Sequence, residues 1–210
     1  MYIHLFIFPR ERINNMNCFN EKEFRELCKR FNAVPHAEEV VLEYARNSFF
    51  NKMRDSVASD RPGEVVFCVI RPDGRIIAIT CSEYPRDIFR IPTGGIHYGE
   101  NIVEAVLRET HEELGLDAEI TDFAGVLKIK FVHENESFMF FSYIFILKET
   151  GGRLLLDASD DEISEVREVD LEGLESIVSS LAGITGRWSD WGKFRHVSSE
   201  AVLKYLKGRI

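Results

Sequence analysis

The sequence predicts a protein of mixed class, α+β or α/β, in which a mainly helical N-terminal region precedes a domain of short strands. Apolar residues recur at helical spacing before residue 60, and apolar strands separated by turns follow Gly63. The 210 residues are 45% hydrophobic and 29% charged, which is typical of a soluble globular chain. We therefore expect an extension over 1–60, a main domain over 61–183, and an aromatic and basic segment with a helix over 184–210.

The extension is predicted to hold two helices, over 21–31 and 36–57. Apolar residues of the second fall on one stripe: Val41, Tyr44, Ala45, Phe49 and Met53. Such a stripe needs a partner surface, so the extension is expected to form a homodimer, which we favour, or to cover the functional site of the main domain. The apolar stretch 1–8 is predicted to be a strand or a packed arm, because it lacks the basic leader and the cleavage site of a signal peptide. No apolar run approaches the roughly 18 residues that span a bilayer, so we expect a cytoplasmic protein without membrane contact.

The main domain is predicted from turns between apolar strands. A Pro-Asp-Gly turn at 72–74 joins strands over 64–71 and 75–80, and the polar turn 133–137 joins two strands within 125–148. The second of these is apolar on both faces, which indicates a strand covered on both sides. A strand over 165–169, a helix over 171–181 and a last helix from about 198 to 207 complete the prediction.

Charge is distributed unevenly along the chain. The formal net charge is −9, and residues 61–180 carry 24 acidic but only 11 basic side chains. This argues against a protein that binds nucleic acid or anionic membranes, because such proteins present a basic surface. Clustered carboxylates instead either solvate a face or hold a cation.

The most informative segment is 94–116, a glycine-containing loop followed by a predicted helix over 100–114 that ends at Gly115. On that helix Glu109, Glu112 and Glu113 share an arc of roughly 100°, beside the apolar face. Three like charges at this spacing repel one another, although Arg108 offsets part of the repulsion. Their pattern fits either a solvated acidic face or a site for a hard divalent cation.

The same segment resembles the signature of the MutT-like Nudix hydrolase family, G-x5-E-x7-R-E-U-x-E-E-x-G-U, where U is a bulky aliphatic residue. The matching residues are Gly94, Glu100, Arg108, Glu109, Glu112, Glu113, Gly115 and Leu116, and Thr110 departs from the first U position. The resemblance implies an α/β/α sandwich with a mixed sheet. It also implies attack by water on a diphosphate linkage that joins a nucleoside diphosphate to another group, assisted by Mg²⁺ or, as a substitute, Mn²⁺.

The resemblance also assigns roles to the motif. Arg108 and three glutamates, Glu109, Glu112 and Glu113, would be catalytic. The same three glutamates and Gly94 would hold the metal. Glu100 and Gly115 would be structural, and Gly95 would let the backbone approach the substrate. Family members often use one more acid from a late loop as a ligand or general base. We favour Glu165 or Glu162 over Asp160 and Asp161, while an ordinary surface loop remains an equal alternative.

Candidate substrate contacts lie outside the signature. His97 follows the glycine pair, and 186–196 interleaves aromatic and basic residues, among them Arg187, Trp188, Trp191 and Arg195. These could stack a base and hold phosphate, or they could form a hydrophobic plug whose charges reach solvent.

The sequence leaves the substrate open. The ADP-ribose branch of the family carries a proline shortly after the signature, whereas no proline follows Pro92 here. We expect a small nucleotide derivative. The alternatives are an RNA 5′-end pyrophosphohydrolase, which the acidic charge opposes, and a non-catalytic nucleotide sensor, which the retained acids oppose.

Overall fold

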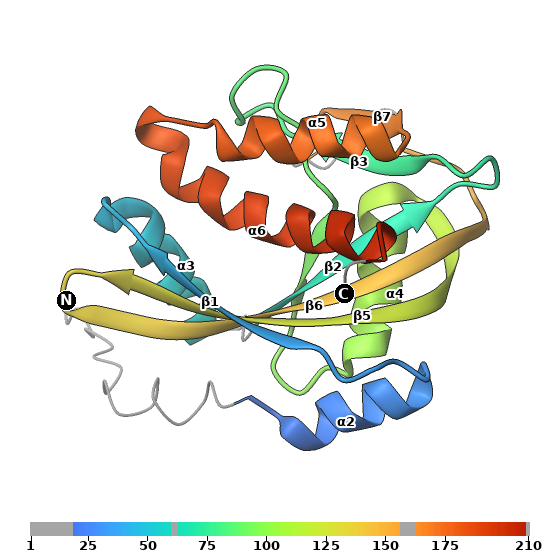
Figure 1. The fold of residues 1–210 in the computed structure, drawn as a ribbon, viewed down its shortest axis with the longest axis horizontal. Coiled ribbons are helices and arrows are strands. Elements are labelled where there is room, and N and C mark those ends of the chain that lie inside the picture. The colour runs from blue at the N-terminus through green and yellow to red at the C-terminus, as the bar shows by residue number, and fades with distance from the viewer. Residues whose placement is uncertain (1–18, 60–62, 156–162, 209–210) are drawn as a thin grey trace, which may run out of the picture.

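The computed structural model describes residues 19–59, 63–155 and 163–208 (Figure 1). The predicted N-terminal arm at 1–8 lies outside these residues, as do Asp160, Asp161 and Glu162. Within the described ranges no helix has the length and apolar character needed to cross a membrane.

The strands of the described residues form one seven-stranded sheet in the order β1-β5-β6-β2-β3-β7, with β4 paired to β2. Pairing is parallel between β1 and β5 and between β2 and β6, and antiparallel elsewhere. The sheet is therefore mixed. The strands are β1 (Ala37–Glu43), β2 (Gly63–Ile70), β3 (Ile76–Thr80), β4 (Thr93–Ile96), β5 (Leu116–His133), β6 (Glu136–Gly152) and β7 (Glu165–Val169).

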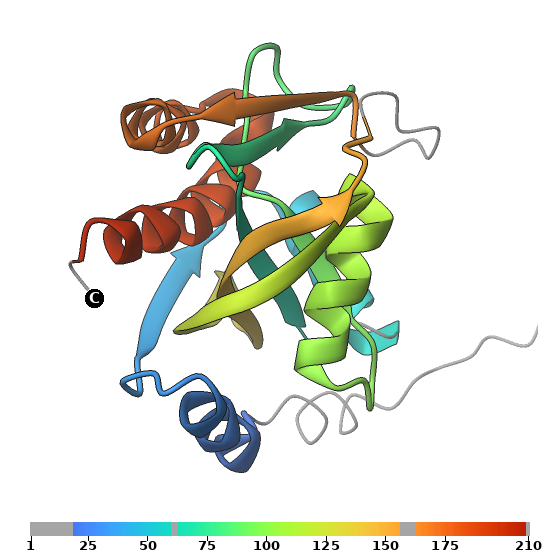
Figure 2. The same ribbon diagram turned by 90° about the vertical axis from the view of Figure 1, so that its right-hand side faces the viewer.

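Helices cover both faces of this sheet (Figures 1 and 2). On one face lie α2 (Glu21–Arg30) and α4 (Ile102–Leu114), whose buried side chains share one hydrophobic cluster. The other face is covered by α3 (Asn47–Ser59), α5 (Leu171–Ala182) and α6 (Ser189–Leu206), the last preceded by the short helix η1 (Gly186–Trp188). The fold is thus the α/β/α sandwich that the sequence predicts.

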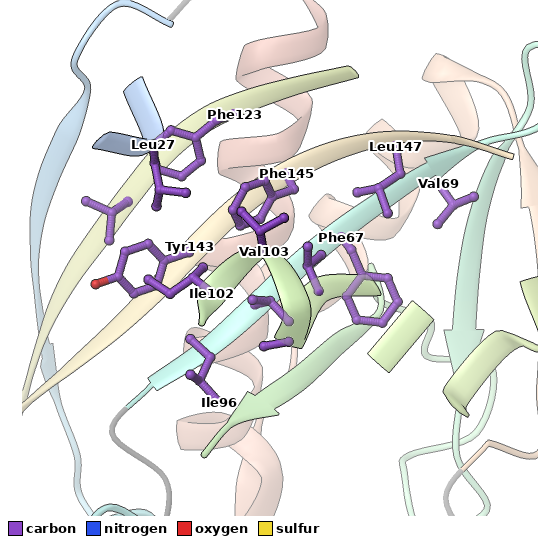
Figure 3. Packing of buried hydrophobic residues seen from close by; sticks show 14 of the residues in the cluster. Leu27, Phe67, Val69, Ile96, Ile102, Val103, Phe123, Tyr143, Phe145 and Leu147 are labelled. Carbon is purple, nitrogen blue, oxygen red and sulfur yellow. The ribbon is translucent and has the colours of Figure 1, made fainter. Parts of the chain in front are cut away.

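Strand β6 shows why the predicted apolar strand has no polar face. Every residue from 140 to 147 is buried, because successive side chains enter the two hydrophobic clusters alternately. Figure 3 shows Tyr143, Phe145 and Leu147 directed into the cluster that also receives Ile102 and Val103 of α4. The predicted hairpin of β2 and β3, the strand β7 and the helix α5 are likewise confirmed.

The prediction of one helix over 36–57 is wrong. Its first part is strand β1, which pairs in parallel with β5 and alternates exposed and more buried residues, and only Asn47–Ser59 is helical. In the strand Leu42 points into the core, whereas the exposed fraction of Val41 is 60%. The continuous stripe that motivated dimerisation therefore does not exist, and dimerisation stays a prediction. The extension also contributes a strand to the main sheet.

The C-terminal helix begins earlier than predicted, at Ser189 rather than near residue 198. Gly192 lies inside this helix, and a side-chain Cβ there would approach Cβ of Ile184 to 2.8 Å. Glycine has a low helix propensity, but at this position it allows α6 to pack closely on Ile184, just before the helix. The segment 186–196, predicted as a substrate-binding stretch, is consequently η1 and the first turns of α6.

Candidate active site

Helix α4 is held at both ends by local hydrogen bonds. The Asn101 side chain accepts hydrogen bonds from the backbone N–H groups of Val103 and Glu104 at 2.9 and 3.3 Å, so the helix begins two residues later than predicted. At the other end Gly115 adopts φ 66° and donates its N–H to His111, a left-handed cap that favours glycine. The apolar face of α4 packs on the sheet, which directs the predicted acidic arc away from the core.

Arg108 donates hydrogen bonds to three glutamates at this acidic arc. Its Nε and Nη2 donate to the two carboxylate oxygens of Glu100 at 2.7 and 2.9 Å, and Nη1 donates to Glu109 and Glu112, both at 2.9 Å. Nη2 also donates to the backbone carbonyl of Gly95 at 3.0 Å. One guanidinium thus binds three glutamates and the strand β4. The hydrogen bond from Arg108 holds the pKa of Glu100 below its ordinary value, with help from the His97 backbone N–H.

Glu109 lies against β4 at a point where only glycine fits. A Cβ placed on Gly94 would be 2.1 Å from Cδ of Glu109, well inside van der Waals contact. The Glu109 side chain is only 13% exposed, although it carries a carboxylate. The strand backbone and Arg108 therefore fix this acid from two sides, which is how a carboxylate is oriented before it binds a ligand.

A second arginine, Arg90, was not predicted as a site residue. It is 5% exposed, and its guanidinium donates to Tyr84 Oη, the Ile91 carbonyl and Thr93 Oγ1 at 3.1, 3.1 and 3.2 Å. Burial alone would lower its pKa, but nearby groups, Tyr84 and Glu113 first among them, raise that pKa above its ordinary value. Arg90 lies four residues before the signature begins, and no spacing rule in the sequence could have indicated it.

Comparison with known proteins decides the family. The family model described as the NUDIX domain matches residues 60–188. The chain belongs to the Nudix family. A curated relative, the ADP-ribose pyrophosphatase of Methanocaldococcus jannaschii, is 28% identical over 131 residues, which cover 62% of this chain and 75% of that protein. With the signature acids in place, the chain is a Nudix pyrophosphohydrolase.

Solved structures of Nudix proteins are also similar to this chain. A NUDIX hydrolase from Nitrosomonas europaea has a TM-score of 0.48 at 14% identity, and covers 70% of this chain and 88% of its own. The structure of a UDP-X diphosphatase has a TM-score of 0.46 at 15% identity, and covers 95% of this chain and 77% of its own.

The aromatic and basic residues at 186–196 divide into two groups in this Nudix fold. Trp191 is 5% exposed and packs on Tyr84 and Trp188 with ring-centroid distances of 4.3 and 5.6 Å. Arg195 Nη1 donates to the buried Glu64 at 2.8 Å. By contrast Arg187 is exposed and Trp188 half-buried, with the guanidinium 5.6 Å from the ring centroid. Only this second pair lies at the surface, where it can meet a ligand.

Glu165 is the first residue of β7, is exposed, and accepts a hydrogen bond from Arg167 at 3.5 Å. Two residues before it, Ile163 is buried in the same hydrophobic cluster as Leu114, at the C-terminal end of α4. The start of β7 is thereby anchored to the core that supports α4. His97 is also exposed, in the loop that joins β4 to α4.

The donor set of the Nudix motif fits a hard divalent cation. Across the residues that the structure describes, no three His, Cys, Asp or Glu side chains are grouped to hold a metal ion. One oxygen each of Glu109 and Glu112 accepts from Arg108. A carboxylate can accept several bonds, so these contacts are compatible with metal binding by the same groups. Carboxylates packed on a glycine backbone are hard oxygen donors suited to Mg²⁺ or Mn²⁺.

Proposed function

We propose that the protein hydrolyses, with Mg²⁺, the diphosphate linkage of a nucleoside diphosphate joined to another group. The observation that carries the proposal is the junction of Arg108 with Glu100, Glu109 and Glu112, placed against the glycines of β4. A solvated acidic face would not need a guanidinium shared among three carboxylates or a glycine at the contact with Glu109.

Glu109, Glu112 and Glu113, with the Gly94 backbone, would hold the divalent ion, and Mn²⁺ could replace Mg²⁺. When bound, the ion would neutralise charge on the diphosphate and lower the pKa of a water molecule. Arg108 keeps the carboxylates oriented through charge-assisted hydrogen bonds. Glu165, exposed at the start of β7, is our candidate to accept the proton of the attacking water.

Four of the remaining predicted residues would contact the substrate. Gly95 and His97 lie where the chain leaves β4 for the catalytic helix, so they would face the phosphates. Arg187 and Trp188 would contact the nucleoside by stacking and charge. Trp191 and Arg195 would instead support this surface, since one packs edge-to-face with Trp188 and the other is paired with Glu64.

ADP-ribose is the first substrate to test, because the relative from Methanocaldococcus jannaschii is an ADP-ribose pyrophosphatase. The lack of a proline after Pro92 argues for a broader panel that includes UDP-linked sugars, dinucleoside polyphosphates and nucleoside triphosphates. The acidic charge of residues 61–180 disfavours RNA, whose phosphates require basic partners.

The test is nucleotide release from this panel with and without Mg²⁺. Glu113→Gln is expected to abolish turnover. The matched control is Glu104→Gln on the same helix, whose side chain is exposed in the first turn and outside the acidic arc, and it should leave turnover unchanged. Binding of nucleotide without turnover would favour a sensor. Turnover confined to 5′-triphosphorylated RNA, with a steep salt dependence, would favour the RNA-end enzyme.

We further propose a cytoplasmic location and a homodimer. Light scattering of the full chain tests the second proposal, and a monomer mass over the working concentration range would contradict it. Cell fractionation tests the first, and recovery with the membrane pellet or the medium would contradict it.

A further inference from the structure

The turn between β4 and α4 is closed by hydrogen bonds between its two ends. The His97 backbone N–H donates to Glu100 Oε2 at 2.9 Å, and the Glu100 N–H donates to the His97 carbonyl at 3.0 Å. The same Glu100 carboxylate accepts two hydrogen bonds from Arg108. The position of this turn therefore sets the position of the arginine that binds the acidic arc.

Tyr98, inside the turn, joins it to the N-terminal extension. Its hydroxyl donates to the backbone carbonyl of Val57, in the last turn of α3. The carbonyls of a last turn have no N–H partner within their helix, and an unpaired carbonyl is costly to bury. Val57 is 2% exposed, so the hydrogen bond from Tyr98 stabilises the end of α3 as well as the turn.

Helix α3 is itself held by the main sheet. Phe50 is 1% exposed, and its ring packs on Phe138 of β6 with the ring centroids 5.1 Å apart. Nη1 of Arg54 donates to Glu136, the first residue of β6, at 2.8 Å. A helix fixed in this way restrains the turn that it contacts.

These contacts form a continuous path from the extension to the acidic arc. Tyr98 binds α3, and the turn that holds Tyr98 is closed on Glu100. Glu100 binds Arg108, which binds two acids of the arc, Glu109 and Glu112. We propose that Tyr98 is a positioning residue through which the N-terminal extension holds this path in place. The inference rests on the proposed metal-dependent hydrolase, and it gives the extension a part in that activity.

Hydrogen exchange of the full-length protein without metal tests the first step of the path. Tyr98→Phe keeps the ring and removes only the hydroxyl. The His97 and Glu100 amides should then exchange about fivefold faster, the effect of losing one hydrogen bond, while the amides of β6 exchange at the wild-type rate. Unchanged exchange at the turn would overturn the proposal. Equal acceleration throughout the sheet would also overturn it, because that result indicates general destabilisation.

Steady-state kinetics with Mg²⁺, on the best substrate of the panel, test the rest of the path. Tyr98→Phe is expected to lower kcat about three- to tenfold, less than the roughly 10–100-fold usual for a group that orients a metal ligand directly. KM should stay within about twofold, because Tyr98 acts through the turn and not on the bound substrate. The matched control is Tyr205→Phe, which removes a hydroxyl bonded to Asp122 from the last turn of α6 and should leave kcat unchanged.

The double variant Tyr98→Phe/Glu100→Ala separates positioning from structural damage. If Tyr98 acts through Glu100, the double variant has the kcat of Glu100→Ala alone. Calorimetry of Mn²⁺ binding gives the same comparison without turnover. An equal further loss in both backgrounds would overturn the proposal, as would a wild-type kcat in Tyr98→Phe.

Failure of the two proposals can be told apart. Wild-type protein without metal-dependent turnover on any substrate would refute the hydrolase and the catalytic role of Tyr98, whereas hydrogen exchange would still decide whether Tyr98 holds the turn. Wild-type turnover that Tyr98→Phe leaves unchanged would refute the role of Tyr98 alone.

Discussion

Gly94→Ala should disable the enzyme while leaving it folded. The new Cβ would lie 2.1 Å from Cδ of Glu109, and ordinary contact begins near 3.4 Å, so the carboxyl must withdraw by the difference, about 1.3 Å. A misplacement of roughly 1 Å can lower a rate about 100-fold, or about 2.7 kcal/mol in activation free energy. The obstructing atoms belong to the Glu109 side chain, not to backbone. The free energy of unfolding should therefore fall by only about 1–3 kcal/mol, the usual cost of a new atom in a packed site.

The assay compares kcat and Mn²⁺ affinity with the midpoint of denaturant unfolding. Gly183→Ala is the matched control, because its Cβ would meet backbone oxygens only at 3.6 Å and its φ of −80° suits alanine. A Gly94→Ala protein with kcat within threefold of wild type would refute the view that contact with Gly94 sets the position of Glu109. A protein that unfolds would instead show that the strand backbone, not the carboxylate, pays the steric cost.

Three further predictions concern pH, the extension and the tryptophans. The pKa of Glu100 is lower in the folded state, so its carboxylate stabilises the fold fully above the unfolded pKa of about 4.3 and loses this effect as pH falls through the folded pKa. In thermal melts Glu100→Gln should therefore lose less stability on acidification than the wild type. Phe50→Ala removes a side chain 1% exposed and should cost about 3–5 kcal/mol in urea unfolding, whereas a loss below 1 kcal/mol would mean that α3 is dispensable to the core. Trp188→Ala should raise KM about tenfold at unchanged stability, whereas Trp191→Ala should mainly destabilise the fold. The reverse pattern would contradict the proposal that Trp188 stacks on the substrate at the surface.

The error at 36–57 shows how two periodicities can coexist in one short segment. Val41, Tyr44 and Ala45 fit a helix, but Val40, Leu42 and Tyr44 alternate as in a strand, and the structure follows the second pattern. The deciding interaction is the parallel pairing of β1 with β5, which lies some 90 residues later in the chain. No local pattern reports such a partner. The earlier start of α6 has a similar origin, because Gly192 packs closely on Ile184, a contact that helix propensity does not report.

The motif was predictable because its geometry is local. The spacing of Glu109, Glu112 and Glu113 places them on one helical face whatever the rest of the chain does. The contacts that orient these acids differ in this respect. Arg108 reaches Glu100 across a loop, which the family resemblance could supply, but its hydrogen bond to the Gly95 carbonyl depends on how β4 packs against α4.

The charge balance of the assembled site explains why one divalent ion should suffice before substrate arrives. In the hydrogen-bonded network Glu100, Glu109 and Glu112 share one arginine, Arg108, which leaves a formal charge of −2. Partial burial makes that residual charge costly, since Glu100 and Glu109 are only 15% and 13% exposed. A single Mg²⁺ would cancel it. Any additional divalent ion would need further negative charge to neutralise it, and the diphosphate of the substrate supplies that charge. Calorimetry should accordingly find one tight Mn²⁺ site in the free enzyme, and two or more tight sites without nucleotide would contradict this balance.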